Sequence, residues 1–172
     1  MADQTPAPQA AADNQPAVTY EKIYVKDMSL EIPHAPHIFL EQEAPALETQ
    51  LNINASNFAE GLYEVVVTAT VTTRLKDKVV FLVELGQGGI FQLRNIPADQ
   101  IDAVVGIHCA AVLYPYLRAN VADLITRAGF PALHLPSVNF DSFFAQRTEE
   151  ARAAQQAGQP APGPTTVIGT TH

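Results

Sequence analysis

The chain has 172 residues, enough for one domain with a hydrophobic core and two tails. Its 18 acidic and 10 basic side chains give a formal net charge of −8. This charge argues against a nucleic-acid-binding protein, which needs a basic face to neutralise phosphates. A single cysteine excludes an internal disulfide and fits a reducing compartment. We find neither a secretory signal nor a run of about 18 apolar residues that would insert into a membrane, and therefore expect a soluble, cytoplasmic protein.

Both ends of the chain have the composition of disordered tails. Residues 1–17 are rich in Ala, Pro, Gln and Asp, and residues 158–172 read GQPAPGPTTVIGTTH. Such segments contain too little apolar surface, or too much Pro and Gly, to join a core. The sequence therefore predicts one folded domain over residues 18–157.

The first half of this domain predicts four antiparallel strands. Apolar and polar side chains alternate over residues 19–31, 47–54 and 62–74, and a fourth strand opens at Lys78. A short turn at Lys76–Asp77 joins the last two strands as a hairpin. Between the first two strands, three prolines predict an irregular crossover. We expect the glycines listed here to break or bulge the fourth strand: Gly86, Gly88 and Gly89.

The fourth strand has an unusual outward face. Alternation places one set of its side chains on one face: Val79, Phe81, Val83 and Leu85. The other face combines aliphatic residues with a carboxylate: Val80, Leu82 and Glu84. A single domain of this size cannot readily cover both faces of its sheet. We therefore expect oligomerisation or a protein partner.

The second half of the domain predicts helices. Pro97 suits a first helical turn, and a short apolar stripe follows it before Gly106. A longer helix with a period near 3.6 covers residues 117–128 and ends at Gly129 and Pro131. A last helix opens at Asp141. The fold class is α+β, with a four-stranded antiparallel sheet and helices packed on one face.

No motif in the chain predicts catalysis, a cofactor or a metal. The glycines after Leu85 lack the spacing and the βαβ context of a dinucleotide fingerprint. His34 and His37 form a weak zinc signal, and ordinary loop histidines explain them better. His108 and Cys109 are adjacent and diverge on a helix. Two alternatives remain open: an enzyme or small-ligand binder that uses Cys109 or the histidines, and a purely structural oligomer.

Five segments in one order resemble the SecB family of bacterial protein-export chaperones. They are YVKDMSLEIPHAPHIF (24–39), YEVVVTATVT (63–72), FLVELGQGGIF (81–91), LYPYLR (113–118) and GFPALHLPSVNFDSFF (129–144). The resemblance implies a holdase that works without ATP, cofactor or metal and is not an enzyme. It also implies a cytoplasmic homotetramer, a dimer of dimers, which holds unfolded precursor proteins and delivers them to the ATPase SecA for translocation. Nucleic acid and direct membrane insertion play no part in it.

The resemblance further implies where the partners bind. SecA is expected to dock on the outer face of the sheet, at Asp27, Glu31, Leu82 and Glu84. The client groove is expected between the crossover and the helices, lined by Phe39, Leu51, Ile53, Tyr116, Phe140 and Phe144. Subunit contacts are expected from Val83, Leu85, Gln87, Leu117 and Val121. The chain has Glu43 near the place where family members often have a tryptophan, which leaves the depth of the groove open.

Overall fold

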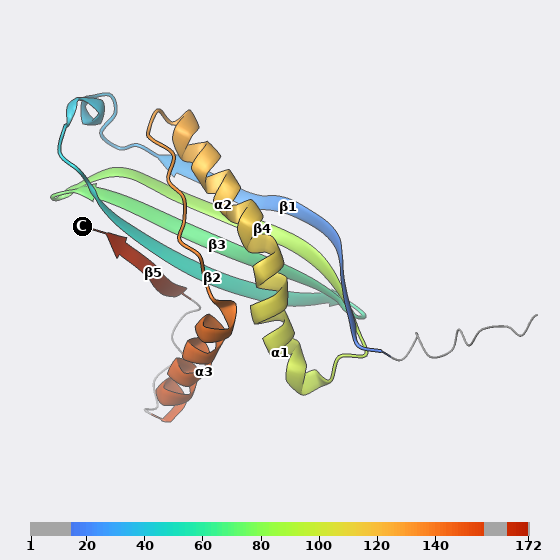
Figure 1. The fold of residues 1–172 in the computed structure, drawn as a ribbon. Coiled ribbons are helices and arrows are strands. Elements are labelled where there is room, and N and C mark those ends of the chain that lie inside the picture. Colours follow the sequence, from blue (N-terminus) through green and yellow to red (C-terminus); the bar gives the residue numbers. More distant parts are fainter. Residues whose placement is uncertain (1–14, 157–164, 172) are drawn as a thin grey trace, which may run out of the picture.

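The computed structural model describes residues 15–156 and 165–171, and it has the α+β architecture that the sequence predicts. A twisted antiparallel sheet is crossed on one face by a long helix and by the extended segment that follows this helix (Figure 1). The strands are β1 (Ala17–Glu31), β2 (Ala46–Ala59), β3 (Leu62–Leu75), β4 (Lys78–Arg94) and β5 (Thr165–Thr171). The helical elements are η2 (His37–Leu40), η3 (Ala98–Gln100), α1 (Ile101–Ala103), η4 (Val104–Cys109), α2 (Ala110–Arg127) and α3 (Phe140–Gln156).

The sheet has the order β1-β4-β3-β2-β5, and neighbouring strands are antiparallel. The four long strands and the β3–β4 hairpin are confirmed. β3 lies at the centre and shows why the alternating pattern predicts a strand. Its helix-facing residues are fully buried: Val65, Val67, Ala69 and Val71. The threonines between them point to the outer face and are half-buried: Thr68, Thr70 and Thr72.

The expected break at the glycines of β4 is wrong, because β4 continues through them to Arg94. A Cβ atom on Gly88 would lie 2.8 Å from the ring of Tyr24, and one on Gly89 would lie 2.8 Å from Leu113. These glycines therefore let a ring and a helix approach the strand closely.

Three bulges change which side chains face the helices. Each adds one residue to a strand, in β1 between Tyr20 and Lys22 and again between Val25 and Asp27, and in β4 at Val80. As a result the apolar residues of β1 share the helix-facing side: Val18, Tyr20, Ile23, Val25, Met28 and Leu30. Val80 is buried at 7% exposure and does not join Leu82 on the outer face as alternation predicts. An extra residue shifts every later side chain to the opposite face.

The two expected helices before residue 128 are one continuous helical run from Ala98 to Arg127, with a π-helical segment at Val104–Cys109. Gly106 does not end it. A Cβ atom there would lie 2.6 Å from the ring of Phe144, so this glycine lets α3 pack against the run. By length and composition this helical run could cross a membrane, the one such stretch in the described residues. It is also the helix that packs on the sheet (Figure 1).

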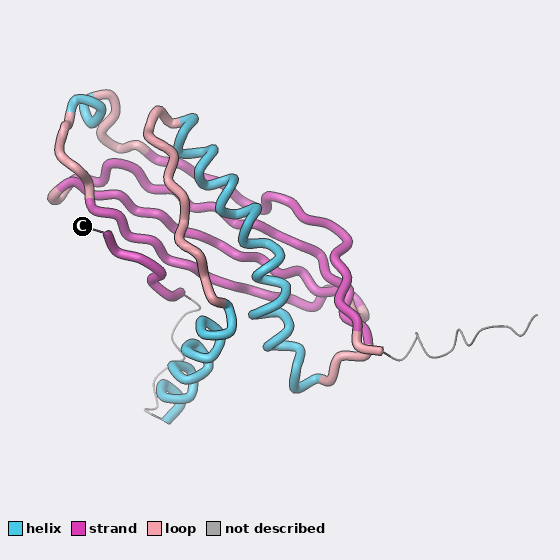
Figure 2. Tube along the Cα trace, viewed as in Figure 1, coloured by secondary structure: helices cyan, strands magenta, loops and turns pink. Residues whose placement is uncertain are grey.

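The C-terminal residues correct the prediction of a loose tail over 158–172. Thr165–Thr171 form β5, which pairs with β2 at the edge of the sheet (Figure 2). The sheet thereby gains a fifth strand beyond the four expected. Of the predicted tail over residues 1–17, residues 1–14 lie outside the described part of the chain, and Ala17 already belongs to β1. Residues 157–164 and 172 also lie outside the described part.

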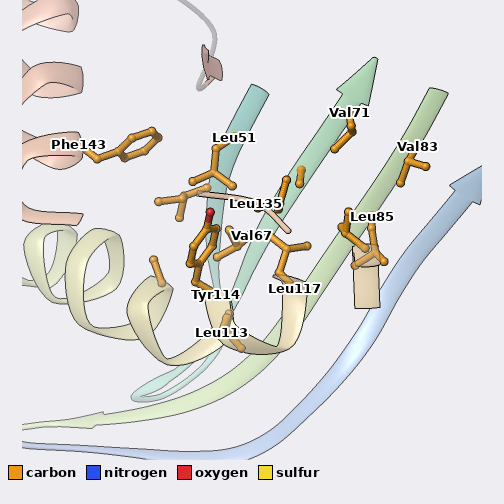
Figure 3. Packing of buried hydrophobic residues seen from close by; sticks show 14 of the residues in the cluster. Leu51, Val67, Val71, Val83, Leu85, Leu113, Tyr114, Leu117, Leu135 and Phe143 are labelled. Carbon is orange, nitrogen blue, oxygen red and sulfur yellow. The ribbon is translucent and has the colours of Figure 1, made fainter. Parts of the chain in front are cut away.

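The core lies between the sheet and α2. Leu113 and Leu117 of α2 are fully buried against Val67 and Leu85 of the sheet, and Leu135 from the segment after α2 lies in the same cluster (Figure 3). This packing buries one face of the sheet and leaves its other face uncovered in the described chain.

Candidate functional site

The four residues expected to dock SecA lie together on the outer face of the sheet. Glu31 of β1 is the cross-strand partner of Leu82 of β4, and Asp27 and Glu84 lie along the same two strands, opposite Gly86 and Ser29 respectively. Cross-strand partners point to the same face with their Cβ atoms about 5 Å apart. The three carboxylates are exposed and Leu82 is half-buried. Among the described residues, none of the three forms an ion pair. The four residues therefore share one surface, which we call the acidic face.

A second polar group on this side of the sheet was not predicted. The Tyr24 hydroxyl donates to Glu64, whose other oxygen lies 2.6 Å from Lys26 Nζ. Tyr24 belongs to β1 and Glu64 to β3, and Tyr24 reaches across β4 because Gly88 has no side chain there. The only signal for this contact in the sequence is that glycine.

This contact shifts the pKa values of both acids. The hydrogen bonds from Lys26 and Tyr24 lower the pKa of Glu64. Burial and the neighbouring carboxylate raise the pKa of Tyr24 to about 12. Glu64 is therefore ionised but paired with Lys26, and it adds little net charge to the acidic face.

On the helix-facing side, a hollow of about 600 Å³ opens beside the crossover. We call it the crossover hollow. Its apolar wall includes Leu47, Val80, Phe81 and Phe130. The Phe130 ring lies 4.9 Å from the ring of Phe81 and 5.1 Å from that of Phe39, which is 48% exposed. Such a concave apolar wall suits the apolar side chains of an unfolded polypeptide.

Glu43 of the crossover lines the crossover hollow. Its carboxylate lies 2.8 Å from Lys76 Nζ, and Glu41 lies 3.3 Å from Lys78 Nζ. Both pairs join the crossover to the β3–β4 turn. They are exposed, so each contributes little energy. The hollow therefore has a polar, adjustable rim at this point.

A second hollow, of about 690 Å³, lies between α3, the π-helical segment and β2. We call it the α3 hollow. Ile53 and Phe144 line it together with Arg147. Arg147 Nη1 lies 3.5 Å from the carbonyl oxygen of Ile53, and its guanidinium lies 5.9 Å from the ring of Phe143. Burial lowers the pKa of Arg147.

The six expected client-groove residues do not form one lining. Phe39 packs against Phe130 beside the crossover hollow but does not line it, whereas Ile53 and Phe144 line the α3 hollow. Leu51 and Phe140 are buried at 0% and 6% exposure, so their side chains are not available to a client. Tyr116 is half exposed on α2 and lines neither hollow. The sequence reasoning also missed Phe81, Phe130 and Arg147. Their roles depend on long-range packing that no local pattern reveals.

The five expected subunit-contact residues are all buried within the protomer. They are at most 2% exposed: Val83, Leu85, Gln87, Leu117 and Val121. Figure 3 shows Val83, Leu85 and Leu117 in the core between the sheet and α2. The expectation of direct contact is therefore wrong for this conformation. Gln87 instead joins three elements. Its Nε2 donates to the Tyr24 carbonyl at 2.8 Å, and its Oε1 accepts from Asn120 of α2 at 2.8 Å.

A different apolar surface is exposed along β1. Tyr20, Val25 and Met28 are 64%, 44% and 52% exposed, on the helix-facing side of the strand. β1 is also the last strand of the sheet at this end, so its outer edge has no strand partner in the described chain. Exposed apolar side chains beside an open edge are typical of a protein–protein interface.

The residues considered for catalysis or metal binding are not arranged for either role. Cys109 is fully buried, and burial raises the pKa of its thiol to about 12. His34 and His37 are exposed on the crossover. Across the described residues, no three His, Cys, Asp or Glu side chains are grouped so as to hold a metal ion.

Comparison with known proteins gives a consistent family. The family model described as "Preprotein translocase subunit SecB" matches residues 11–151. The protein-export protein SecB of Bordetella petrii is 54% identical over 158 residues, which cover 92% of this chain and 90% of that protein. That of Cupriavidus metallidurans is 53% identical over 156 residues, 91% of this chain and 90% of that protein.

A solved structure shares the fold. It is that of the Mycobacterium tuberculosis Rv1957 SecB-like chaperone in complex with a ChAD peptide from the Rv1956 HigA1 antitoxin. The two chains superpose with a TM-score of 0.59 at 16% sequence identity, over 74% of this chain and 93% of that one.

Proposed function

This chain belongs to the SecB family, and from that premise and its surfaces we propose that it is an ATP-independent holdase of the cytoplasm. It keeps secretory precursor proteins unfolded and delivers them to SecA for translocation. The observation that carries the proposal is the division of the sheet into two working faces. The crossover hollow, with its apolar wall, lies on the helix-facing side together with the α3 hollow, where Ile53 and Phe144 lie among charged side chains such as Arg147. The acidic face lies on the other side. A client and a motor protein can therefore bind at the same time.

Client binding is supported by the apolar wall of the crossover hollow and by the apolar side chains of the α3 hollow, whose lining also contains charged residues. An unfolded chain presents apolar side chains in no fixed order, so its receptor must be apolar and adaptable. The crossover hollow meets this need with the rings of Phe81 and Phe130, and the exposed Phe39 ring packs on Phe130 beside it. Holding requires no nucleotide, because a protein that binds only the unfolded state shifts the folding equilibrium by mass action.

Docking of SecA is supported by the chemistry of the acidic face. Asp27, Glu31 and Glu84 surround the partly exposed Leu82. This arrangement fits a basic segment that carries apolar side chains. Charge speeds the encounter and fixes orientation, and burial of the leucine supplies hydrophobic affinity.

We propose a homotetramer built as a dimer of dimers, with β1 as one of its contact surfaces. The open edge of β1 and its exposed Tyr20, Val25 and Met28 support this contact. The buried residues first assigned to the interface would act indirectly, by holding α2 in place. Light scattering at micromolar concentration measures the mass, and a stable monomer would contradict this part of the proposal.

We infer that the protein is not an enzyme and requires no cofactor. The rival hypothesis uses Cys109 or the histidines as working groups. The Cys109 thiol is fully buried, and its raised pKa keeps it protonated at neutral pH. Among the described residues, no histidine belongs to a group of three His, Cys, Asp or Glu that could hold a metal ion. Substrate turnover that is lost in Cys109→Ser would favour the rival.

The holdase activity is tested by mixing a urea-denatured secretory precursor with the protein in the absence of ATP. We expect slower refolding and a complex of defined mass. Phe39→Ser should weaken holding, because the exposed Phe39 ring packs on Phe130 and extends the apolar surface beside the crossover hollow. Phe58→Ser is the matched control, since Phe58 is similarly exposed, at 54%, at the far end of β2. Unchanged refolding with the unmodified protein would refute the proposal.

Docking is tested by Asp27→Asn combined with Glu84→Gln. Each exposed charge contributes up to about 1 kcal/mol, so affinity for SecA should fall about three- to thirtyfold at low salt while client holding persists. The control is Glu60→Gln with Asp77→Asn, which removes the same charge from exposed positions outside the acidic face. Unchanged affinity at low salt, or an equal loss in the control, would refute this assignment.

A further inference from the structure

The edge of β2 is occupied by the protein's own C-terminal segment. Residues Leu47–Asn52 of β2 pair with Thr165–Thr171 of β5, which lies on the side of β2 opposite β3. In Figure 1, β5 runs beside β2 at the rim of the sheet. An open sheet edge accepts extended chains through backbone hydrogen bonds that do not depend on side-chain identity.

This part of β2 also connects the two hollows. Leu47, at one end of the paired region, lines the crossover hollow. Ile53, directly after its other end, lines the α3 hollow and meets Arg147. The strand between them spans about 20 Å, at about 3.3 Å per residue. An extended chain on this edge would thus pass from one hollow to the other, and β5 fills the middle of that path.

The sequence of β5 is that of a segment that a sheet edge accepts. It reads TTVIGTT, with β-branched residues at every position except the glycine, and it has no charge. β-branched residues favour the extended conformation. The segment therefore has the same general chemistry as the uncharged, extended stretches of an unfolded client.

The pairing is built in a way that permits exchange. The register shifts by one residue between Thr49 and Gln50, where Ile168 is the extra residue of β5. The bulge divides the ladder into two short parts. β5 also pairs on one side only, because it is the last strand of the sheet. A short, interrupted outer strand is the part of a sheet that opens most easily.

We propose that β5 is an internal competitor for client chains: it covers the β2 edge between the two hollows until an extended segment of an unfolded polypeptide replaces it. This inference rests on the proposed holdase function and adds a regulatory role for the C-terminal segment. Replacement exchanges one set of backbone hydrogen bonds for another, so the β2 edge stays paired. A paired edge cannot pair with the strand of another molecule, and this reduces aggregation.

The size of the effect follows from the population of the open edge. The measured affinity for a client that uses this edge is reduced by the fraction of molecules in which the edge is free. If β5 covers the edge in about nine molecules of ten, removing it should strengthen binding about tenfold.

The first experiment changes residues 165–171 to a Gly-Ser sequence of equal length. This variant preserves the length and the charge of the tail and removes its β propensity. The probe is reduced, carboxymethylated α-lactalbumin, which is permanently unfolded, and its Kd is measured by fluorescence anisotropy. We expect a several-fold to tenfold lower Kd than for the unmodified chain. A fluorescein-labelled TTVIGTT peptide should bind the variant more tightly than it binds the unmodified chain.

The second experiment locks β5 in place. Gln50 and Val167 are cross-strand partners, a spacing within reach of a disulfide, so Gln50→Cys with Val167→Cys should cross-link the segment to β2. The oxidised protein should bind the unfolded probe several-fold more weakly than the same protein after reduction. The reduced protein is the matched control because it carries the same substitutions.

The outcomes separate the inference from the function on which it rests. Equal Kd values for the unmodified chain, the Gly-Ser variant and the oxidised protein would overturn the role of β5 and leave the holdase function intact. If neither the unmodified chain nor the Gly-Ser variant binds the probe, the holdase function fails as well. Circular dichroism of each variant shows that the sheet is retained.

Discussion

Gln87 provides a quantitative test of how the sheet positions α2. Its side chain is 2% exposed and bridges the Tyr24 carbonyl of β1 and Asn120 of α2 through two hydrogen bonds of 2.8 Å. Gln87→Leu has a similar volume and removes both bonds. It leaves a carbonyl acceptor facing an apolar side chain, and such an unsatisfied buried group costs about 1–3 kcal/mol. The half-buried Asn120 amide can turn toward water and should add less than about 1 kcal/mol.

We therefore expect Gln87→Leu to lower the free energy of unfolding by about 2 kcal/mol. For a domain of this size, this loss corresponds to a decrease in Tm of roughly 4–8 °C. Asn120→Ala removes one bond at a half-buried position and should cost about 1 kcal/mol. The double variant should cost less than the sum of the two, because both single changes remove the same hydrogen bond.

Urea unfolding at fixed protein concentration measures these differences, with an unchanged m-value as the check that the same transition is observed. Light scattering on the same variants tests whether α2 supports the assembly, since its displacement should shift the mass toward smaller species. If Gln87→Leu unfolds within about 0.3 kcal/mol of the unmodified protein, the bridge makes no net contribution and the reasoning is wrong.

Three further outcomes are expected. Gly89→Ala should destabilise the protein by about 1–3 kcal/mol in thermal unfolding, because the added Cβ would lie 2.7 Å from a phenylalanine ring carbon. Gly86→Ala is the control and should cost clearly less, because its nearest contact is at 3.5 Å. Equal costs of the two substitutions would contradict this prediction. The pKa of Glu64 is lowered in the folded protein from its ordinary value of 4.5, so ionised Glu64 stabilises the fold above pH 4.5. This stabilisation is lost as the pH falls through the lower folded pKa. Acid titration of Glu64→Gln should therefore show a smaller loss of stability between pH 5 and 3 than the unmodified protein. Since burial raises the pKa of Cys109 to about 12, a thiol reagent at pH 8 should modify it only after unfolding, and rapid labelling of the native protein would contradict its burial.

The sequence predicted the α+β fold well, because local alternation encodes the strands. A period of two along β3 is enough to separate buried valines from outward threonines. The same alternation placed Asp27 with Glu31, and Leu82 with Glu84. The resemblance to the SecB family then brought these pairs from two strands into one surface, and the register of β1 against β4 confirms that they share it.

Alternation failed where the chain carries an extra residue or where long-range packing decides. The bulge between Val25 and Asp27 brings Met28 to the helix-facing side with Val25. No local pattern reveals such a bulge, because its position depends on the partner strand. The buried position of Gln87 beneath α2 likewise depends on where a helix more than twenty residues later crosses the sheet.

By itself, the sequence determined the four long strands, the family and the acidic composition, because short-range periodicity and the order of segments encode them directly. Three features are visible only in the tertiary structure. The absence of a side chain at Gly88 lets Tyr24 reach Glu64 across β4. The residues expected to bind clients do not share one hollow, and Thr165–Thr171 pair with β2. These features join residues far apart in the chain. Their existence depends on which strands become neighbours and on the space that glycines leave between them, and this information is present only once the whole sheet is assembled.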